Sequence, residues 1–353
     1  MSKAAICVVV PVYKAMATLD RCVESILAQQ VEGGLTCILV DDGSPDESGA
    51  LCDAWAAKDD RVTVIHQDDL GVSGARNSGL AAADSEFIVF LDSDDALRPG
   101  ALQAALTAQR AAPQDFVVWH YTTDEKDPAA VTADAEPHPQ AGLARLWLDC
   151  LLAMPWNKLY RADLAKQLQF DVQYTLGEDL QFVLDYIALL GQTVPEFGYR
   201  VMTSPLTFYD CSRGGTLSTR YHANYCDIWP KHFAKLNAAC HAAACPAEDM
   251  RPLHRAELQV FAEGVADIMR RDPSPTQRLK GYKAEAALRS PWLRALLERM
   301  KIEGCYSAYY LPCRWHNVGL VCRVDEARRA NAPLYGKLDW AGYYLLLGRM
   351  RRD

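Results

Sequence analysis

Strand-like and helix-like segments alternate through the first hundred residues, and this alternation constrains the fold more than any other feature of the chain. The apolar segments predicted to be buried strands are 6–12, 35–40, 62–66 and 86–91. The segments predicted to be helices between them are 18–30, 45–57 and 72–83. Strands that alternate with helices form a parallel sheet covered on both faces, so the sequence predicts an α/β domain.

The alternation continues to about residue 221 and then gives way to helices. The further predicted elements of this part are a helix at 99–110, a strand at 116–121, and helices at 143–153 and from about residue 178. The stretch 122–140, rich in Pro, Asp and Ala, is expected to be a surface loop. Beyond residue 222 the pattern is helical, with amphipathic stretches at 255–270 and 292–300.

The composition of the 353-residue chain indicates a globular protein of the cytoplasm. Its longest apolar runs, such as 5–10 and 343–347, are far shorter than the ~20 residues that a membrane-spanning helix needs. A single Lys3 before a β-branched run that stops at Pro11 does not resemble a secretory signal. The twelve cysteines include no Cys-x-x-Cys pair, and buried free thiols are the favoured interpretation.

Acidic side chains follow the second and fourth predicted strands where these strands end. Asp41 and Asp42 follow the second strand, and Asp92, Asp94 and Asp95 follow the fourth. In an open parallel sheet, ligands gather at the carboxyl ends of the strands. Crowded carboxylates repel one another unless a cation compensates them, and an Asp-x-Asp suits Mg²⁺ or Mn²⁺. One acidic pair would be an ordinary polar turn, but two clusters at one edge indicate a binding site.

The segment 71–79, which reads GVSGARNSG, is predicted to be a glycine-rich loop that leads into a helix. Its flexible backbone and the Arg76 guanidinium suit contact with a nucleotide or its phosphates, although such turns are common. No GxxxxGK[ST] occurs, and no GxGxxG follows the first strand, which argues against a P-loop NTPase and a dinucleotide-binding dehydrogenase. His66, His120 and His316 lack metal-ligand spacing and receive no role.

Four motifs occur in order along this part of the chain: CVVVPVYKAMATLDRCVESILAQQ, ILVDDGSPDES, GVSGARNSGL and FIVFLDSDD. Together with PWNKLYR at 155–161 and GEDLQF at 177–182, they resemble the family 2 glycosyltransferases of bacterial polysaccharide synthesis. The resemblance covers about residues 4–220. It implies a GT-A fold, in which a Rossmann-like mixed sheet is flanked by helices.

The resemblance also implies a division of the chain. Residues 1–221 are expected to form a GT-A catalytic domain, with a nucleotide-binding half over about 1–100 and an acceptor half over about 101–221. Residues 222–353 are expected to form a mostly helical C-terminal region.

Residues at the end of the first two strands are implied to hold the nucleotide. Pro11, Val12 and Tyr13 would line the base and ribose pocket. Asp41 would accept a hydrogen bond from the base, and Asp42 belongs to the same nucleotide-sugar site.

The diphosphate end of the donor is implied to lie on the glycine-rich segment and the Asp-Ser-Asp. Arg76 would approach the base or diphosphate, and Gly74 would allow close backbone contact. Asp92 would face the ribose and the metal, Ser93 lies beside it in the donor site, and Asp94 would ligate Mn²⁺ or Mg²⁺ directly. Asp95 is expected to shape the turn.

The catalytic and acceptor-binding residues are implied on the later motifs. Displacement at an anomeric carbon needs a base on the attacking hydroxyl and neutralisation of the leaving diphosphate on the opposite side. Asp179 falls where the family places its base, with Glu178 beside it as an acceptor-binding residue. Trp156, Asn157 and Lys158 are assigned to the acceptor site, Trp156 against a sugar face and Lys158 against a phosphate. The alternatives are a helix-start carboxylate for Asp179 and a core aromatic for Trp156.

The predicted function is that of an inverting glycosyltransferase acting on a nucleotide-sugar, expected to be a UDP-sugar. It would transfer a hexose or N-acetylhexosamine to a hydroxyl of a cell-surface glycan or lipid-linked acceptor. A non-catalytic scaffold or partner subunit is the alternative, which the acids at 92, 94 and 179 disfavour. A sugar nucleotidyltransferase would need a glycine-rich signature that PVYKAMATL lacks. No nucleic-acid partner is predicted.

The C-terminal end is a separate electrostatic region. Residues 280–353 carry 14 Lys and Arg against 7 Asp and Glu, a net charge of +7, within a chain of net charge −8. Its aromatic and terminal basic residues are Trp292, Trp315, Trp340, Tyr343, Tyr344, Arg349, Arg351 and Arg352. This pattern predicts peripheral contact with anionic lipid at the inner face of the cell membrane, or docking to a partner. The alternative is a helical cap with core aromatics.

Overall fold

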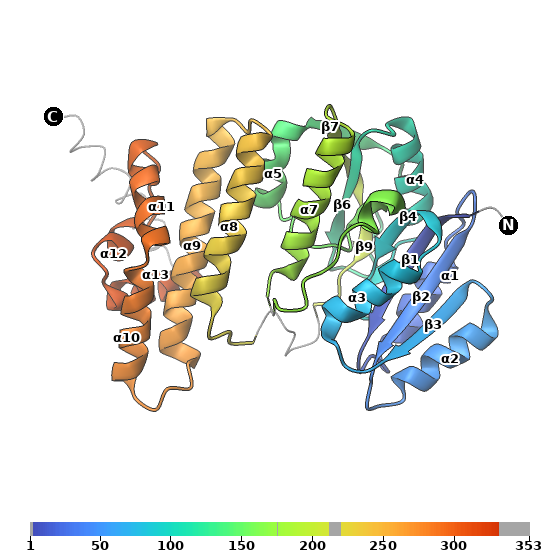
Figure 1. Ribbon diagram of the computed structural model, residues 1–353, viewed down its shortest axis with the longest axis horizontal. Coiled ribbons are helices and arrows are strands. Elements are labelled where there is room, and N and C mark those ends of the chain that lie inside the picture. The colour runs from blue at the N-terminus through green and yellow to red at the C-terminus, as the bar shows by residue number, and fades with distance from the viewer. Residues whose placement is uncertain (1–2, 175, 212–219, 332–353) are drawn as a thin grey trace. The chain divides into compact units, whose positions relative to one another are not determined.

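The computed structural model describes residues 3–174, 176–211 and 220–331, and the chain forms two compact units, 1–214 and 215–353 (Figure 1). This division falls a few residues before the boundary expected at 221/222. Residues 340, 343, 344, 349, 351 and 352, part of the predicted membrane contact, lie outside the described residues.

Unit 1 is built on one mixed sheet. Its strands are β1 (Ala4–Val12), β2 (Leu35–Asp42), β3 (Val62–Gln67), β4 (Ser85–Phe90), β5 (Ala96–Leu97), β6 (Phe116–Thr122), β7 (Ala135–Pro139), β8 (Lys158–Arg161) and β9 (Gly198–Phe208). The strand order is β3-β2-β1-β4-β8-β6-β9-β5, and β7 pairs with β9. β1 to β4 pair in parallel, whereas β8 runs antiparallel to both β4 and β6.

The helices of unit 1 are α1 (Leu19–Leu27), α2 (Ser48–Lys58), α3 (Gly71–Ala82), α4 (Ala101–Ala111), α5 (Leu143–Leu148), α6 (Ala162–Ala165) and α7 (Glu178–Thr193), with a 3₁₀ turn, η1 (Gln140–Gly142). β1 is buried along almost its whole length, as expected for a central parallel strand covered on both faces. α1 buries Leu19, Cys22, Val23 and Ile26, which recur at helical spacing. These side chains join the core that the first strands form.

The structure confirms the four predicted strands of the first hundred residues and corrects the later part. β7 lies inside 122–140, which was expected to be a loop, and β9 was not predicted. β7 acquires its structure by pairing with β9, from Ala135 opposite Met202 to Pro139 opposite Gly198, and β9 also pairs with β6 and β5. Tertiary pairing outweighs a local composition that favours turns.

Unit 2 is helical, as predicted. Its helices are α8 (Tyr225–Ala242), α9 (Ala247–Arg271), α10 (Gln277–Leu288), α11 (Pro291–Ile302), α12 (Tyr310–Arg314) and α13 (Val318–Arg329). α9 contacts α8, α10, α11 and α13 and therefore lies at the centre of the unit. Trp292 packs near Phe233 and Phe261, whereas Trp315 is 62% exposed. Among the described residues, no helix is both long enough and apolar enough to cross a membrane.

Candidate active site

The parallel strands bring the predicted donor residues to one edge of the sheet. Val12 at the end of β1 is in register with Asp41 of β2, which is in register with His66 of β3. β4 pairs with the other side of β1, with Phe90 beside Val9, and the chain then turns through Asp92. The carboxyl ends of these strands therefore gather the predicted residues, as expected for this topology.

The base side of the predicted pocket combines buried strand ends with an acid and a histidine. Pro11 and Val12 are buried, whereas Tyr13 is 44% exposed. Asp41 accepts a hydrogen bond from the Ser44 amide at 3.2 Å, and its Oδ2 lies 3.1 Å from His66 Nδ1.

His66 was missed by the sequence reasoning, although strand register could have found it. Its Nε2 lies 2.9 Å from Asp53 Oδ1, so the ring bridges Asp53 and Asp41. The hydrogen bonds to these two carboxylates raise the pKa of His66. The imidazole therefore holds the Asp41 side chain at this edge of the sheet.

Asp42 and the glycines of segment 71–79 serve the packing of α3. Asp42 Oδ1 accepts from Gln67 Nε2 at 2.7 Å and from the Leu70 amide at 2.9 Å. A Cβ on Gly74 would lie 2.5 Å from Leu70 Cβ, so glycine is required for this contact. The structure confirms the helix predicted at 72–83 as α3, whereas the interpretation of 71–79 as a loop was wrong, because this segment lies within the helix.

Arg76 links the predicted donor site to the predicted base. Its side chain is 3% exposed, and its Nη1 donates to Asp179 Oδ1 at 2.5 Å while its Nη2 donates to Asp92 Oδ1 at 2.8 Å. The Phe170 ring lies 5.4 Å from the guanidinium carbon. The two carboxylates outweigh the effect of burial and raise the pKa of Arg76. The guanidinium thus carries its charge between two acids that are far apart in sequence.

Asp179 is held where it can exchange a proton near neutral pH. It lies in the first turn of α7, directly after Glu178 and after Gly177, which adopts a φ of +77°. Burial raises the pKa of Asp179 to about 7, and the negative charges of Glu178 and Asp92 act in the same direction, against Arg76. Because 30% of the side chain remains exposed, the carboxylate is also accessible. These are the properties of a general base.

Hydrogen bonds from Arg21 and from the Asp210 amide hold the turn after β4 in place. Arg21 Nη2 donates to the Asp94 carbonyl at 2.6 Å and to Asp210 Oδ2 at 2.7 Å. The Asp210 amide donates to Asp95 Oδ1 at 3.0 Å. Asp95 is fully buried, and burial together with the Asp92 charge raises its pKa to about 9. These contacts fix the turn that carries Asp92, Ser93 and Asp94, each of which is partly exposed.

The donor set of this turn fits a hard divalent cation. Asp92 and Asp94 supply carboxylate oxygens, and the described residues contain no group of three or more His, Cys, Asp or Glu placed to hold a metal ion. Mg²⁺ and Mn²⁺ bind through one or two carboxylates and complete their coordination with phosphate oxygens and water. Two acids on an exposed turn are thus sufficient for an ion that binds together with a diphosphate.

Asn157 and Lys158 find their partners inside the protein. Asn157 Nδ2 donates to the Trp119 carbonyl at 3.0 Å. Lys158 Nζ donates, at 2.6 Å each, to the carbonyls of Leu151 and Met154 and to Asn157 Oδ1, and both side chains are fully buried. Burial lowers the pKa of Lys158 well below its usual range. The two residues hold the 151–157 segment together, and their contact with an acceptor stays a prediction.

Trp156 is part of an aromatic group that the sequence did not indicate. It is 4% exposed and stacks on Tyr209, with ring centroids 5.4 Å apart and planes at 16°. Tyr121 contacts both rings edge-on. Trp156 is therefore buried, as the alternative of a core aromatic predicted. Its neighbours Tyr121 and Tyr209 are partly exposed.

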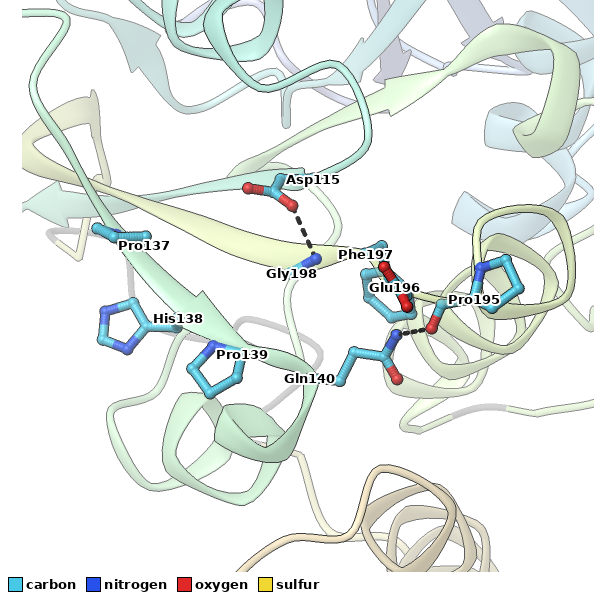
Figure 2. Close-up of a pocket in the computed structure, with 9 residues that line it drawn as sticks. All are labelled: Asp115, Pro137, His138, Pro139, Gln140, Pro195, Glu196, Phe197 and Gly198. Carbon is cyan, nitrogen blue, oxygen red and sulfur yellow. Dashed lines mark hydrogen bonds between the residues drawn. The ribbon is translucent and has the colours of Figure 1, made fainter.

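A separate open cavity of about 520 Å³ lies where β7 and β9 pair (Figure 2). Asp115 Oδ1 accepts from the Gly198 amide at 2.8 Å, and Gln140 Nε2 donates to the Pro195 carbonyl (Figure 2). Arg200 Nε donates to the other Asp115 oxygen at 2.7 Å. The side chains of Asp115 and Gln140 are thus occupied within the protein, and none of the predicted site residues lines this cavity.

Named proteins are similar to part of the chain. Glycosyltransferase GlyG of Streptococcus pneumoniae is 40% identical over 35% of this chain and 41% of its own length. The succinoglycan biosynthesis protein ExoO of Rhizobium meliloti is 31% identical over 54% of this chain and 58% of its own length. This chain thus spans about half the length of these relatives.

A solved structure shares the fold, and a family model matches part of the chain. The crystal structure of S. aureus TarS 1–349 in complex with UDP-GlcNAc superimposes with a TM-score of 0.60 at 17% identity, over 93% of this chain and 92% of that one. This likeness shows the fold, which is GT-A. The model of glycosyl transferase family 2 matches residues 7–169. The matched segment contains the acids of β2 and of the turn after β4, so the chain carries a glycosyl transferase family 2 domain over residues 7–169.

Proposed function

We propose that the protein is an inverting glycosyltransferase that transfers a sugar from a nucleotide-sugar to a hydroxyl of a cell-surface glycan or lipid-linked acceptor. One observation carries the proposal: Arg76 contacts both Asp92, at the donor edge of the sheet, and Asp179, a carboxylate with a pKa of about 7. The Arg76 guanidinium thus lies between Asp92, an acid of the proposed nucleotide-sugar site, and Asp179, the proposed acceptor of the proton. The relatives named for polysaccharide synthesis support this class of acceptor.

Asp179 performs the proton transfer in the proposed reaction. It takes the proton of the acceptor hydroxyl while that oxygen forms a bond to the anomeric carbon. The bond from the same carbon to the diphosphate oxygen breaks on the opposite face, so the configuration inverts. A Mn²⁺ or Mg²⁺ ion held by Asp92 and Asp94 would neutralise charge on the diphosphate. Arg76 positions both carboxylates before the substrates bind.

A donor-hydrolysis screen tests the proposal without knowledge of the acceptor. The purified 353-residue chain is incubated with UDP-, GDP- and dTDP-sugars and Mn²⁺, and release of the nucleotide is measured. A UDP-sugar is the first choice, since TarS, which has a similar fold, was solved with UDP-GlcNAc. Release from one donor that Asp179→Asn slows supports the proposal. Nucleotide binding without turnover, on any donor or on a broad acceptor panel, would favour the scaffold alternative.

Removal of the metal is expected to abolish donor hydrolysis. Excess EDTA should stop nucleotide release, and added Mn²⁺ should restore it, because Asp92 and Asp94 are suited to a divalent ion. Asp94→Asn, which keeps the shape of the turn, should raise the Mn²⁺ concentration for half-maximal hydrolysis at least about tenfold, since it removes a charged ligand. Full activity in EDTA would contradict the assignment.

Asp41→Ala is expected to weaken nucleotide binding and to leave the metal requirement unchanged. Asp41 belongs to the base side of the edge, and loss of one hydrogen bond made by a charged group corresponds to about 1.5–3 kcal/mol, or roughly 10- to 150-fold in Kd. Calorimetry with UDP measures the change. Asp53→Ala is the matched control, because it removes the other carboxylate from His66 and keeps Asp41. Unchanged UDP affinity in Asp41→Ala would reject the role.

A further inference from the structure

A basic cavity of about 240 Å³ lies within unit 2, between the turns that begin α11 and end α12. Its basic lining residues are Arg289, Arg294, Arg314 and His316, and Glu298 is the acid among them. Ser290, the residue before α11, also lines it and caps the helix by accepting from the Leu293 amide at 3.3 Å. Three guanidinium groups thus converge near a helix N-terminus, where the backbone contributes partial positive charge.

The charge of this cavity is only partly neutralised. Arg314 pairs with Glu298 at 2.7 Å, and Arg289 pairs with Glu285 at 2.5 Å, with every one of these side chains more than 40% exposed. The Arg294 side chain is exposed and forms no ion pair or hydrogen bond within the described residues. Exposed pairs exchange readily for a better ligand because they contribute little energy. The cavity therefore suits a phosphate, which guanidinium groups bind through paired hydrogen bonds.

An exposed indole adjoins the cavity. Trp315, which is 62% exposed, lies in the chain between the lining residues Arg314 and His316. A tryptophan beside cationic side chains is typical of surfaces that enter the boundary between lipid head groups and acyl chains. Basic side chains beside an exposed indole distinguish this site from a site for free phosphate, because a free phosphate would not contact an exposed apolar ring.

We propose that this cavity binds the phosphate of an anionic phospholipid, with the Trp315 ring in the lipid interface. The ligand class follows from three guanidinium groups around a small cavity and one exposed indole between two of its lining residues. This role is independent of the proposed transferase activity, since every residue in it belongs to α10, α11, α12 or their connections.

Vesicle flotation of the full chain tests the proposal. At low salt, the protein is expected to float with vesicles of phosphatidylglycerol and phosphatidylcholine and not with phosphatidylcholine alone. Each basic side chain near an anionic surface contributes roughly fivefold to partitioning, so Arg294→Glu should lower it roughly 25-fold. The matched control is Arg323→Glu on α13, an exposed arginine without an ion pair in the described part of the chain, which does not line the cavity and should lower partitioning less than Arg294→Glu does. Equal losses in both variants would overturn the site.

A second pair of measurements distinguishes lipid from free phosphate. Trp315→Ala should reduce vesicle binding and leave the affinity for inorganic phosphate, measured by calorimetry, unchanged. Near-ultraviolet circular dichroism verifies that each variant is folded. Binding of inorganic phosphate by a protein that does not float with anionic vesicles would overturn the lipid assignment. So would flotation that is insensitive to both Arg294→Glu and Trp315→Ala.

Discussion

Replacement of Asp179 by asparagine is expected to lower kcat by about 10²–10⁴ and to leave donor and metal binding intact. Asparagine is nearly isosteric with aspartate and can still accept a hydrogen bond from Arg76, but it cannot take the proton of the acceptor hydroxyl. Steady-state kinetics at saturating donor and acceptor measure kcat, and calorimetry measures the affinity for UDP. Binding and chemistry should therefore separate in this variant.

The control for this prediction is Glu178→Gln, which changes the neighbouring acid in the same turn of α7. It should affect KM for the acceptor more than kcat. The pH profile provides a second readout: because the base must be deprotonated and burial raises the pKa of Asp179 to about 7, kcat/KM of the wild type should fall as the pH drops below about 7. Unchanged kcat in Asp179→Asn would remove this residue from the mechanism and make Glu178 the next candidate.

Replacement of Arg76 by methionine is expected to destabilise unit 1 by about 3 kcal/mol, because it leaves Asp92 and Asp179 without their shared counter-ion. This value is at the lower end of the about 3–5 kcal/mol for breaking a buried pair, since the two carboxylates are about 30% exposed. For a unit of this size the loss corresponds to a decrease in Tm of roughly 6–12 °C. Thermal unfolding followed by circular dichroism measures it.

The matched control for Arg76 is Arg110→Met, which removes a surface pair with Glu32 whose side chains are 41% and 77% exposed. It should cost less than about 1 kcal/mol. Loss of Arg76 also has a kinetic signature that a structural role alone would not produce. Since Arg76 opposes the rise in the pKa of Asp179, its removal should move the acidic limb of the kcat/KM profile to higher pH. Equal stability of both variants would show that the bridge is unimportant.

The sequence was sufficient to predict the donor half of the sheet. Val8 and Val10 belong to an apolar, β-branched run too short for a helix, and the acids at the end of β2 and in the turn after β4 mark the carboxyl ends of buried strands. Parallel topology then places these acids at one edge. The position of His66 beside Asp41 follows from the same register and could have been predicted with it.

The contacts around Arg76 could not be predicted in the same way. Asp92 and Asp179 lie 16 and 103 residues from Arg76, and no local periodicity records a pairing at such separations. Lys158 is a second example, because lysine is almost never fully buried, and its three oxygen partners become available only when the 151–157 segment folds around it. Local sequence specifies helices and strands, whereas the partners of Arg76 and Lys158 depend on how segments distant in sequence pack together.

The position of β8 determines the order in which unit 1 can fold during synthesis. β1 to β4 are contiguous in sequence and pair only with one another and with β8, so they can assemble as soon as they leave the ribosome. The edge of β4 stays open until residues 158–161 arrive, and the later strands join the sheet through β8. A nascent chain that pauses before this point exposes an apolar strand edge that can pair with another chain. Pairing of the four residues of β8 with β4 thus ends the period during synthesis in which aggregation competes with folding.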